Sequence, residues 1–288
     1  MDVYNNIETV LPSIAKMGES PCWDEQNNIL YFIDIVGKKL ISFFPSDPQL
    51  KKWTLPTTPG TVALTNNNKL ILALTSGIYA FDLASREFTK LTDPDPREHK
   101  ASRFNDGKCD SCGRFWVGTT NMERKPVCWL YQYTAERGLV AYESNLTISN
   151  GLAWSPDNKK MYRVDTWISK VFSYDFDENT GNISNRRLII EVPKENGLPD
   201  GMEVDVEGKL WIAHWGGYCV CRYDDETGQM LAKIETPVKY PTCCTFGGKS
   251  LNLLYITSAQ NDDTNPMAGS LFKVSLPVAG MPTHRFLI

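Results

Sequence analysis

The stretch GESPCWD, at residues 18–24, is followed after a polar turn by the hydrophobic run LYFID at residues 30–34. Three later pairs of segments repeat this order, a polar start and then an aromatic or β-branched run: NDGKCD (105–110) with FWVGT (115–119), NGLAWS (150–155) with MYRVD (161–165), and DGMEVD (200–205) with LWIAH (210–214). Short apolar runs that are bounded by Asp, Asn and Gly are typical of β-hairpins. The repeat therefore predicts a chain that is built from one kind of hairpin.

Extended along the chain, the pattern defines six units with a period of roughly 40 to 50 residues, which is typical of propeller blades. The units start near Gly18, Pro59, Arg103, Ile148, Leu198 and Tyr240. Each unit contains four candidate strands, and no segment has a sustained helical period. We therefore predict an all-β protein: a six-bladed β-propeller with four-stranded blades, forming one domain over residues 1–288.

A closed ring needs a device that joins its ends, because an open array would leave sheet edges exposed. The segment IETVLPSIA, at residues 7–15, precedes the first unit and has the composition of a strand. We expect this N-terminal strand to complete the last blade, beside SLFKV at residues 270–274. The C-terminal PTHRFLI, at residues 282–288, is a second candidate for pairing in the same blade.

Composition narrows the class of protein. The hydrophobic content of 42% is enough for a large core, and a net charge of -4 argues against binding to nucleic acid. The N-terminus lacks the basic and apolar regions of a signal peptide, and no apolar run approaches the roughly 20 residues of a membrane span. We expect a cytoplasmic protein without a membrane partner, whose eight cysteines are free thiols. Cys219 and Cys221 alternate along one apolar strand and are predicted to face the core.

One position recurs near the start of the inner strand of each unit, where that strand meets one mouth of the channel. It is occupied by Glu19, Gly60, Asp106, Asn150, Asp200 and Thr242. Any one Asp or Asn here could simply cap a turn. Several acids crowded at one mouth would repel one another, however, and a bound cation would relieve that repulsion. We expect the substrate to have room on the uncharged side, at Gly60 and Thr242.

The motifs GESPCW (18–23), RFNDGKCD (103–110), SNGLAWS (149–155) and PDGM (199–202) together resemble the gluconolactonase/regucalcin family of sugar lactonases, which are related to senescence marker protein. The resemblance covers nearly the whole chain, with the motifs in the same order and at the same spacing. It implies a six-bladed propeller with one divalent metal ion in its channel.

The resemblance also implies roles for individual residues. It assigns the metal ligands to Glu19, Asn150 and Asp200, contacts with the sugar to Arg103, Asn105 and Glu123, and the role of general base to Asp200. The chain departs from the family pattern at Ser20, Cys22 and Arg163, and the sequence leaves open whether Arg163 faces the site.

The predicted ligands are all oxygen donors, which suits a hard cation. Ca²⁺ is the expected ion, with Mg²⁺, Mn²⁺, Zn²⁺ and Fe²⁺ as alternatives. Such an ion would polarise the carbonyl of a lactone, and Asp200 would activate the attacking water. His99, His214 and His284 are far apart in the repeat, so a histidine-based metal site is not expected, although His214 could approach the mouth.

The leading hypothesis is therefore a metal-dependent lactonase that hydrolyses a sugar lactone to the aldonic acid. Two alternatives use the same channel. One is a promiscuous arylesterase or organophosphate hydrolase acting at the same metal. The other is a calcium-binding regulatory or scaffold propeller, because a fold alone does not establish catalysis.

Overall fold

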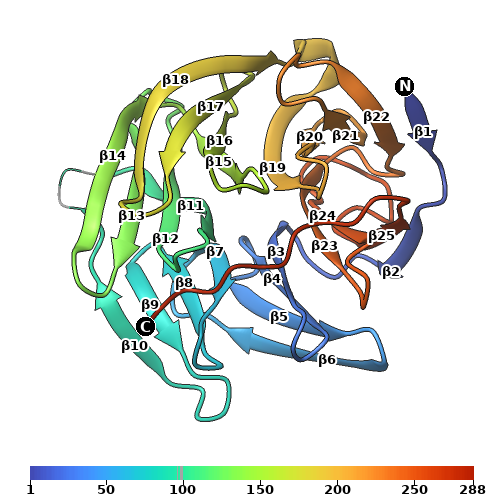
Figure 1. Ribbon diagram of the computed structural model, residues 1–288. Coiled ribbons are helices and arrows are strands. Elements are labelled where there is room, and N and C mark those ends of the chain that lie inside the picture. Colours follow the sequence, from blue (N-terminus) through green and yellow to red (C-terminus); the bar gives the residue numbers. More distant parts are fainter. Residues whose placement is uncertain (96, 98–99) are drawn as a thin grey trace.

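Six sheets follow one another in a ring in the computed structural model, which describes residues 1–95, 97 and 100–288 (Figure 1). The first blade contains β3 (Gly18–Asp24), β4 (Ile29–Asp34), β5 (Lys39–Phe44) and β6 (Asp47–Thr54). The second contains β7 (Pro59–Leu64), β8 (Leu70–Leu74), β9 (Gly77–Phe81) and β10 (Phe88–Thr92). The third contains β11 (Ser102–Cys109), β12 (Phe115–Asn121), β13 (Cys128–Thr134) and β14 (Gly138–Leu146).

The remaining three blades repeat this antiparallel order. The fourth contains β15 (Ser149–Trp154), β16 (Lys160–Asp165), β17 (Lys170–Asp177) and β18 (Asn182–Glu191). A 3-10 helix, η1 (Lys194–Asn196), leads into the fifth, which contains β19 (Leu198–Val204), β20 (Leu210–Trp215), β21 (Cys219–Tyr223) and β22 (Met230–Glu235). The sixth contains β23 (Pro241–Gly247), β24 (Leu253–Ser258) and β25 (Leu271–Ser275) together with the N-terminal β2 (Glu8–Leu11).

This architecture confirms the predicted six-bladed propeller. Every inner strand starts within one residue of the start that the repeat predicts. The predicted ring closure is also confirmed, since β2 pairs antiparallel with β25 and aligns Thr9 with Phe272. One strand was not predicted: β1 (Asp2–Tyr4) adds to the outer edge of the fifth blade, parallel to β22. The N-terminal segment therefore joins the last two blades.

The C-terminal segment does not pair in the last blade, so that expectation is wrong. The outer edge of β25 is already occupied by β2, and the last residues instead cross the ring towards β9 (Figure 1). Phe286 donates its N–H to the carbonyl of Leu64 at 2.8 Å and buries its ring against Tyr133. We call residues 278–288 the C-terminal strap.

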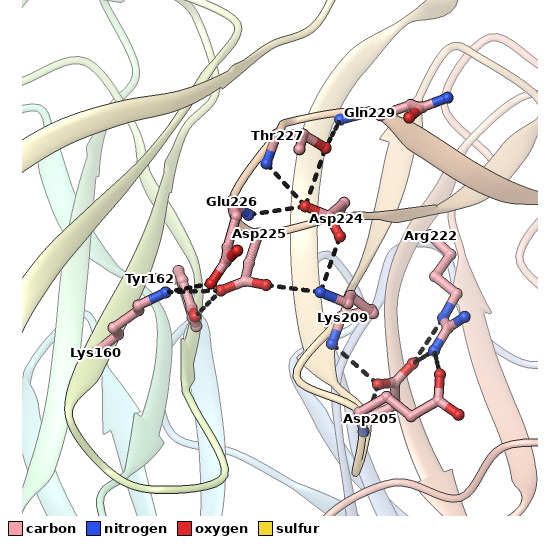
Figure 2. Close-up of polar contacts among 11 residues, drawn as sticks. Lys160, Tyr162, Asp205, Lys209, Arg222, Asp224, Asp225, Glu226, Thr227 and Gln229 are labelled. Atoms are coloured by element: carbon pink, nitrogen blue, oxygen red, sulfur yellow. Dashed lines mark hydrogen bonds and ion pairs between the residues drawn. The ribbon is translucent and has the colours of Figure 1, made fainter.

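The core consists of apolar clusters between neighbouring blades, and the buried Trp23 and Trp154 are part of it. Polar groups also join blades. Between the fourth and fifth blades, Asp225 accepts hydrogen bonds from Lys160 at 3.1 Å, Tyr162 at 2.8 Å and Lys209 at 3.1 Å (Figure 2). Asp225 is buried, and its carboxylate accepts from two side chains of the fourth blade and one of the fifth. These hydrogen bonds therefore link the two blades.

Within blades, a side-chain oxygen closes the turn between the first two strands. Asp205 accepts from the backbone of Glu207 and Lys209 (Figure 2), and Asp110 accepts from the backbone of Cys112 and Arg114. Both aspartates also accept from the indole of a tryptophan six positions later, Trp211 and Trp116. The turn chemistry of the repeat is therefore structural at this end of the inner strands. No helix in the described part of the chain has the length and apolar character needed to cross a bilayer.

Candidate functional site

Each inner strand shifts its register with the next strand close to its own start. The shift falls between Glu19 and Cys22 on β3, between Phe104 and Gly107 on β11, between Asn150 and Leu152 on β15, and between Pro199 and Met202 on β19. A β-bulge of this kind redirects the side chains at the extra residues. The polar residues predicted from the repeat therefore lie where the backbone is least regular.

A cavity of about 390 Å³ lies at this end of the channel, and we call it the acidic cavity. Five of the six predicted site residues line it, each near the start of an inner strand: Glu19, Arg103, Asn105, Asn150 and Asp200. Glu123 is not a lining residue. It lies between Met122 and Arg124, which both line the cavity, and its carboxylate forms an ion pair with Lys125 at 2.5 Å.

The substrate does not have room at Gly60 and Thr242, so that expectation is wrong. A Cβ added to Gly60 would lie 2.4 Å from the carbonyl oxygen of Phe104, which shows that two inner strands approach closely there. Thr242 is fully buried and donates to the carbonyl of Gly18 at 2.6 Å. The cavity is lined instead by residues at the end of a second strand or directly after it, among them Ile35, Thr166 and Trp215.

Hydrogen bonds hold the amides of the acidic cavity in place. The Asn150 amide donates to Asp200 Oδ1 and, at 3.1 Å, to the Thr166 hydroxyl. This leaves Asn150 Oδ1 buried and without a hydrogen-bond partner. The Asn105 amide donates to the carbonyl of Ser149 at 3.2 Å, and its oxygen accepts from Arg103 at 3.1 Å. Both asparagines are thus oriented by contacts between neighbouring blades.

The ionised forms of the two carboxylates in the cavity are disfavoured. Burial raises the pKa of Glu19 well above its usual value, the charges of Asp200 and Asp106 raise it further, and Arg103 only partly opposes them. Burial and the charge of Asp106 likewise raise the pKa of Asp200 well above its usual value, against the hydrogen bond from Asn150. The ionised forms therefore lack enough positive charge in their surroundings.

A divalent cation fits this arrangement. Glu19 and Asp200 supply two carboxylates, and Asn150 Oδ1 is a buried oxygen that has a free lone pair. Oxygen donors of this type are those that hard divalent ions prefer. A cation held among them would offset the charge repulsion and satisfy the orphaned carbonyl oxygen.

The rim of the cavity contains residues that the sequence alone did not single out. The guanidinium of Arg124, from the loop after β12, lies 4.1 Å from the ring centroid of Trp167, from the loop after β16. Arg124 has a φ of 59°, a left-handed conformation that the loop must hold in place. Trp215 packs against Tyr240 with ring centroids 4.5 Å apart. Arg124 and Trp167 lie in loops and Trp215 is the last residue of β20, so the strand periodicity did not identify them.

The opposite end of the channel holds a smaller cavity of about 60 Å³, which we call the strap cavity because Met281, Pro282 and His284 of the strap line it. Asp106 lines this cavity, although it is adjacent to Asn105 in the sequence. Lys108 Nζ lies 3.0 Å from Glu203 Oε2 and also donates to the carbonyl of Met202. Burial works to lower the pKa of Lys108, but the charges of Glu203, Cys243 and Asp106 together with the hydrogen bond to Glu203 outweigh it and raise the pKa above its usual value.

Arg163 and His214, which the sequence left as possible site residues, do not line the acidic cavity. Arg163 is fully buried beside Glu143, at 3.2 Å, and Asp165, at 3.4 Å. His214 is buried and does not line the cavity, and burial lowers its pKa to about 4. His99 lies outside the described residues.

Comparison with known proteins places these features in context. Residues 17–260 match the sequence family described as SMP-30/Gluconolactonase/LRE-like region. The chain is 36% identical to regucalcin of Oryctolagus cuniculus over 97% of this chain and 98% of that protein. It superposes on the structure of a calcium-binding protein, regucalcin, from Agrobacterium tumefaciens with a TM-score of 0.91 and 25% identity, covering 99% of both chains.

A further solved structure shares the architecture. XC5397 of Xanthomonas campestris, described as a gluconolactonase, superposes with a TM-score of 0.78 and 25% identity, covering 94% of this chain and 89% of that one. The similarity to these proteins extends over nearly all of the ring, so it includes the strands that form both cavities.

Proposed function

This chain belongs to the SMP-30/gluconolactonase/LRE-like family, and from that premise we propose that it is a divalent-metal-dependent lactonase that hydrolyses a sugar lactone to the aldonic acid. One observation carries the proposal beyond the family resemblance. The carboxylates of Glu19 and Asp200 and the unpartnered oxygen of Asn150 converge on one cavity, where nearby positive charge is too weak to offset the two acids.

We assign the metal to Glu19, Asn150 and Asp200, with Ca²⁺ as the expected ion. When bound, it would supply a Lewis acid that polarises the lactone carbonyl and favours the oxyanion of the hydrolytic step. The name of the Agrobacterium relative, a calcium-binding protein, supports the choice of Ca²⁺. Zn²⁺, Mg²⁺, Mn²⁺ and Fe²⁺ are alternatives that the same oxygen donors can accept.

Asp200 is proposed as the general base. Its Oδ1 accepts the hydrogen bond from Asn150, which fixes the carboxylate and leaves the second oxygen to take a proton from water. Burial and the charge of Asp106 raise its pKa in the metal-free site, and a bound cation would favour the ionised form that can accept a proton. The amide of Asn150 thus positions the group that moves the proton.

Arg103 and Asn105 are proposed to bind the sugar. The guanidinium has one nitrogen committed to Asn105 and to the carbonyl of Phe104, so the rest of its planar donor group can face the ligand. Its fork is suited to sugar hydroxyls or to the carboxylate that hydrolysis generates. Glu123 is proposed to contact substrate hydroxyls from the rim, which requires its carboxylate to turn away from Lys125.

A second function uses the same site without catalysis. A calcium-binding propeller would need the ligands Glu19, Asn150 and Asp200 but not the sugar-binding groups. The printed description of the Agrobacterium relative as a calcium-binding protein favours this candidate. The variant Arg103→Gln distinguishes the two functions. If the protein is a lactonase, the variant should hydrolyse lactone more slowly; if it only binds calcium, the variant should bind calcium as wild type does.

The direct test is proton release during hydrolysis of a panel of aldonolactones, measured on metal-stripped protein with single divalent ions added back. Asp200→Asn should abolish the metal-stimulated rate. Asp106→Asn is the matched comparison, because it neutralises another buried acid that lines the strap cavity and acts on Asp200 only through its charge, so it should reduce the rate far less. Equal rates for wild type and Asp200→Asn would overturn the proposal, as would faster turnover of a phosphotriester than of every lactone in the panel.

A further inference from the structure

A second group of metal-ligating side chains lies in the fifth blade, outside the acidic cavity. His214 is on β20, and Cys219 and Cys221 are on β21. Their ligand atoms all lie within 4.8 Å of one another, and they are the only such group of three His, Cys, Asp or Glu residues in the part of the chain that the structure describes. All three side chains are buried.

Strand pairing brings these side chains together. β20 and β21 are antiparallel, with His214 directly opposite Cys219, and alternation along β21 puts Cys221 on the same face. The Cys221 thiol lies 3.5 Å from the Cys219 sulfur. Two thiolates on a tetrahedral zinc ion are about 3.8 Å apart, given a Zn–S bond of about 2.3 Å. The sulfur atoms therefore need to move by only a few tenths of an ångström.

The imidazole is already oriented as a ligand. Nδ1 of His214 lies 2.9 Å from the carbonyl oxygen of Asn196 in η1, and because a carbonyl only accepts, Nδ1 carries the proton. Nε2 then keeps its lone pair, to which the Tyr223 hydroxyl donates at 3.2 Å. A backbone carbonyl that fixes the tautomer of a histidine in this way is the usual partner of a metal-bound imidazole.

The chemistry of the three donors selects the ion. Thiolates and imidazole favour soft or borderline metals and do not suit Ca²⁺ or Mg²⁺. Two thiolates exactly balance the charge of a divalent ion, which matters for a buried site because an unbalanced buried charge is costly. A neutral imidazole completes three protein ligands, the number found in Cys₂His zinc sites that keep a fourth position for an oxygen.

We propose that His214, Cys219 and Cys221 bind one Zn²⁺, with the Tyr223 hydroxyl as the oxygen nearest the fourth position. Binding forms two Zn–S bonds and one Zn–N bond, breaks the hydrogen bond from the Tyr223 hydroxyl to Nε2 of His214, and releases the two thiol protons to solvent. The ion ties β20 to β21 and, through the hydrogen bond from His214 to Asn196, to the linker between the fourth and fifth blades. Its role is structural and separate from the ion in the acidic cavity.

The test uses Co²⁺ as a spectroscopic probe of the full-length, reduced and metal-stripped protein. Thiolate ligands give an intense charge-transfer absorption that oxygen ligands do not, so the two metal sites are distinguishable. Wild type is expected to develop this absorption to a plateau at one equivalent and to lose it when Zn²⁺ is added. The double variant C219S/C221S should lose the absorption completely, and His214→Gln should weaken Co²⁺ binding by at least tenfold.

Control variants test whether the absorption comes from the proposed site or from other buried thiols, and whether a loss of absorption reflects unfolding. C128S/C244S removes two other buried thiols, which are bonded to backbone carbonyls, and should keep the full absorption. Asp200→Asn should keep it as well, because it leaves the two thiols and the imidazole in place. Absence of thiolate absorption in folded wild type would overturn the proposal, and so would its persistence in folded C219S/C221S.

Discussion

Both cavities of the channel are lined by residues of β3, β11, β15 and β19, but the two cavities differ in how far their buried acidic side chains are paired with basic ones. In the strap cavity, Lys108 lies 3.0 Å from Glu203 and balances that carboxylate, while Asp106 is a further acid there. In the acidic cavity, Glu19 and Asp200 both have raised pKa values, through burial and the charges of neighbouring acids, and Arg103 does not balance them. A site whose charges are paired within the protein supports the fold, whereas a site with excess negative charge is prepared for a cation.

The bulge on β11 shows how neighbouring residues come to serve different cavities. Asn105 and Asp106 both fall within the register shift between Phe104 and Gly107. Asn105 lines the acidic cavity and Asp106 lines the strap cavity. One irregular step in the strand thus separates a proposed substrate contact from a buried acid that acts on the site only through its charge.

The largest effect is expected for Asp200→Asn in the acidic cavity. Loss of the proposed general base and of one proposed metal ligand should reduce kcat/KM for lactone hydrolysis by roughly 10²–10⁴-fold. The same change removes a buried acid with a raised pKa, so the metal-free protein should become more stable. Steady-state kinetics and thermal unfolding with a chelator measure the two effects. A variant that is both inactive and less stable without metal would show that Asp200 supports the fold as Lys108 and Glu203 do.

The next largest effect is expected for Lys108→Met in the strap cavity. It leaves Glu203 charged and without its ion-pair partner, which costs about 3 kcal/mol of unfolding free energy. Urea unfolding measures this loss, while kcat per folded molecule should stay within about twofold of wild type. Because Lys108→Met/Glu203→Gln removes both charges, the double variant should recover more than half of the loss. A single variant as stable as wild type would show that this pair does not support the fold.

A smaller effect with a defined pH dependence is expected for Asp106→Asn. Burial raises the pKa of Asp106 to about 6, so the folded protein holds this proton more tightly than the unfolded chain, and the ionised carboxylate destabilises the fold at neutral pH. The variant should therefore be more stable than wild type by roughly 1–3 kcal/mol at pH 7. The gain should shrink as the pH falls through about 6 and vanish near the pKa of an unfolded aspartate, about 4. A gain that grows towards acid pH would contradict the assignment.

The smallest effect is expected for Glu123→Gln at the rim. Its carboxylate is paired with Lys125, has 46% of its side-chain surface exposed and does not line the cavity. We expect KM to rise by about two- to fivefold with little change in kcat, since one exposed hydrogen bond to substrate contributes roughly 0.5–1 kcal/mol. Arg103→Gln is the variant for comparison and should lower kcat/KM more than Glu123→Gln does. If kcat/KM falls further for Glu123→Gln than for Arg103→Gln, the substrate is bound mainly at the rim and not at Arg103.

The sequence predicted the ring well because strand alternation and turn residues are local properties. The position of Glu19, Asn150 and Asp200 near one mouth follows from the repeat alone. Which of Asn105 and Asp106 enters the acidic cavity does not, because that depends on where the bulge places its extra residue. The partner of Phe286 was equally hidden, since it depends on β2 having already taken the edge of β25.

Other features needed the register between strands or the paths of loops. Cys219 and Cys221 were predicted as core residues, and they are buried, but only the alignment of His214 with Cys219 shows the cluster. Arg124 and Trp167 come from loops of different blades, and their contact depends on how those loops fold over the cavity. Nothing in the spacing of either residue encodes that contact.

The most direct measurement of the central claim is a calcium titration of metal-stripped protein in which bound ion and lactone hydrolysis are followed together. We predict that stripped wild type is inactive and that activity returns in proportion to one bound equivalent. Glu19→Gln and Asp200→Asn should lose binding and activity, whereas Asp106→Asn should still bind one equivalent and lose far less activity than either. Full lactone hydrolysis by the stripped protein, or unchanged ion binding in Glu19→Gln and Asp200→Asn, would contradict the central claim.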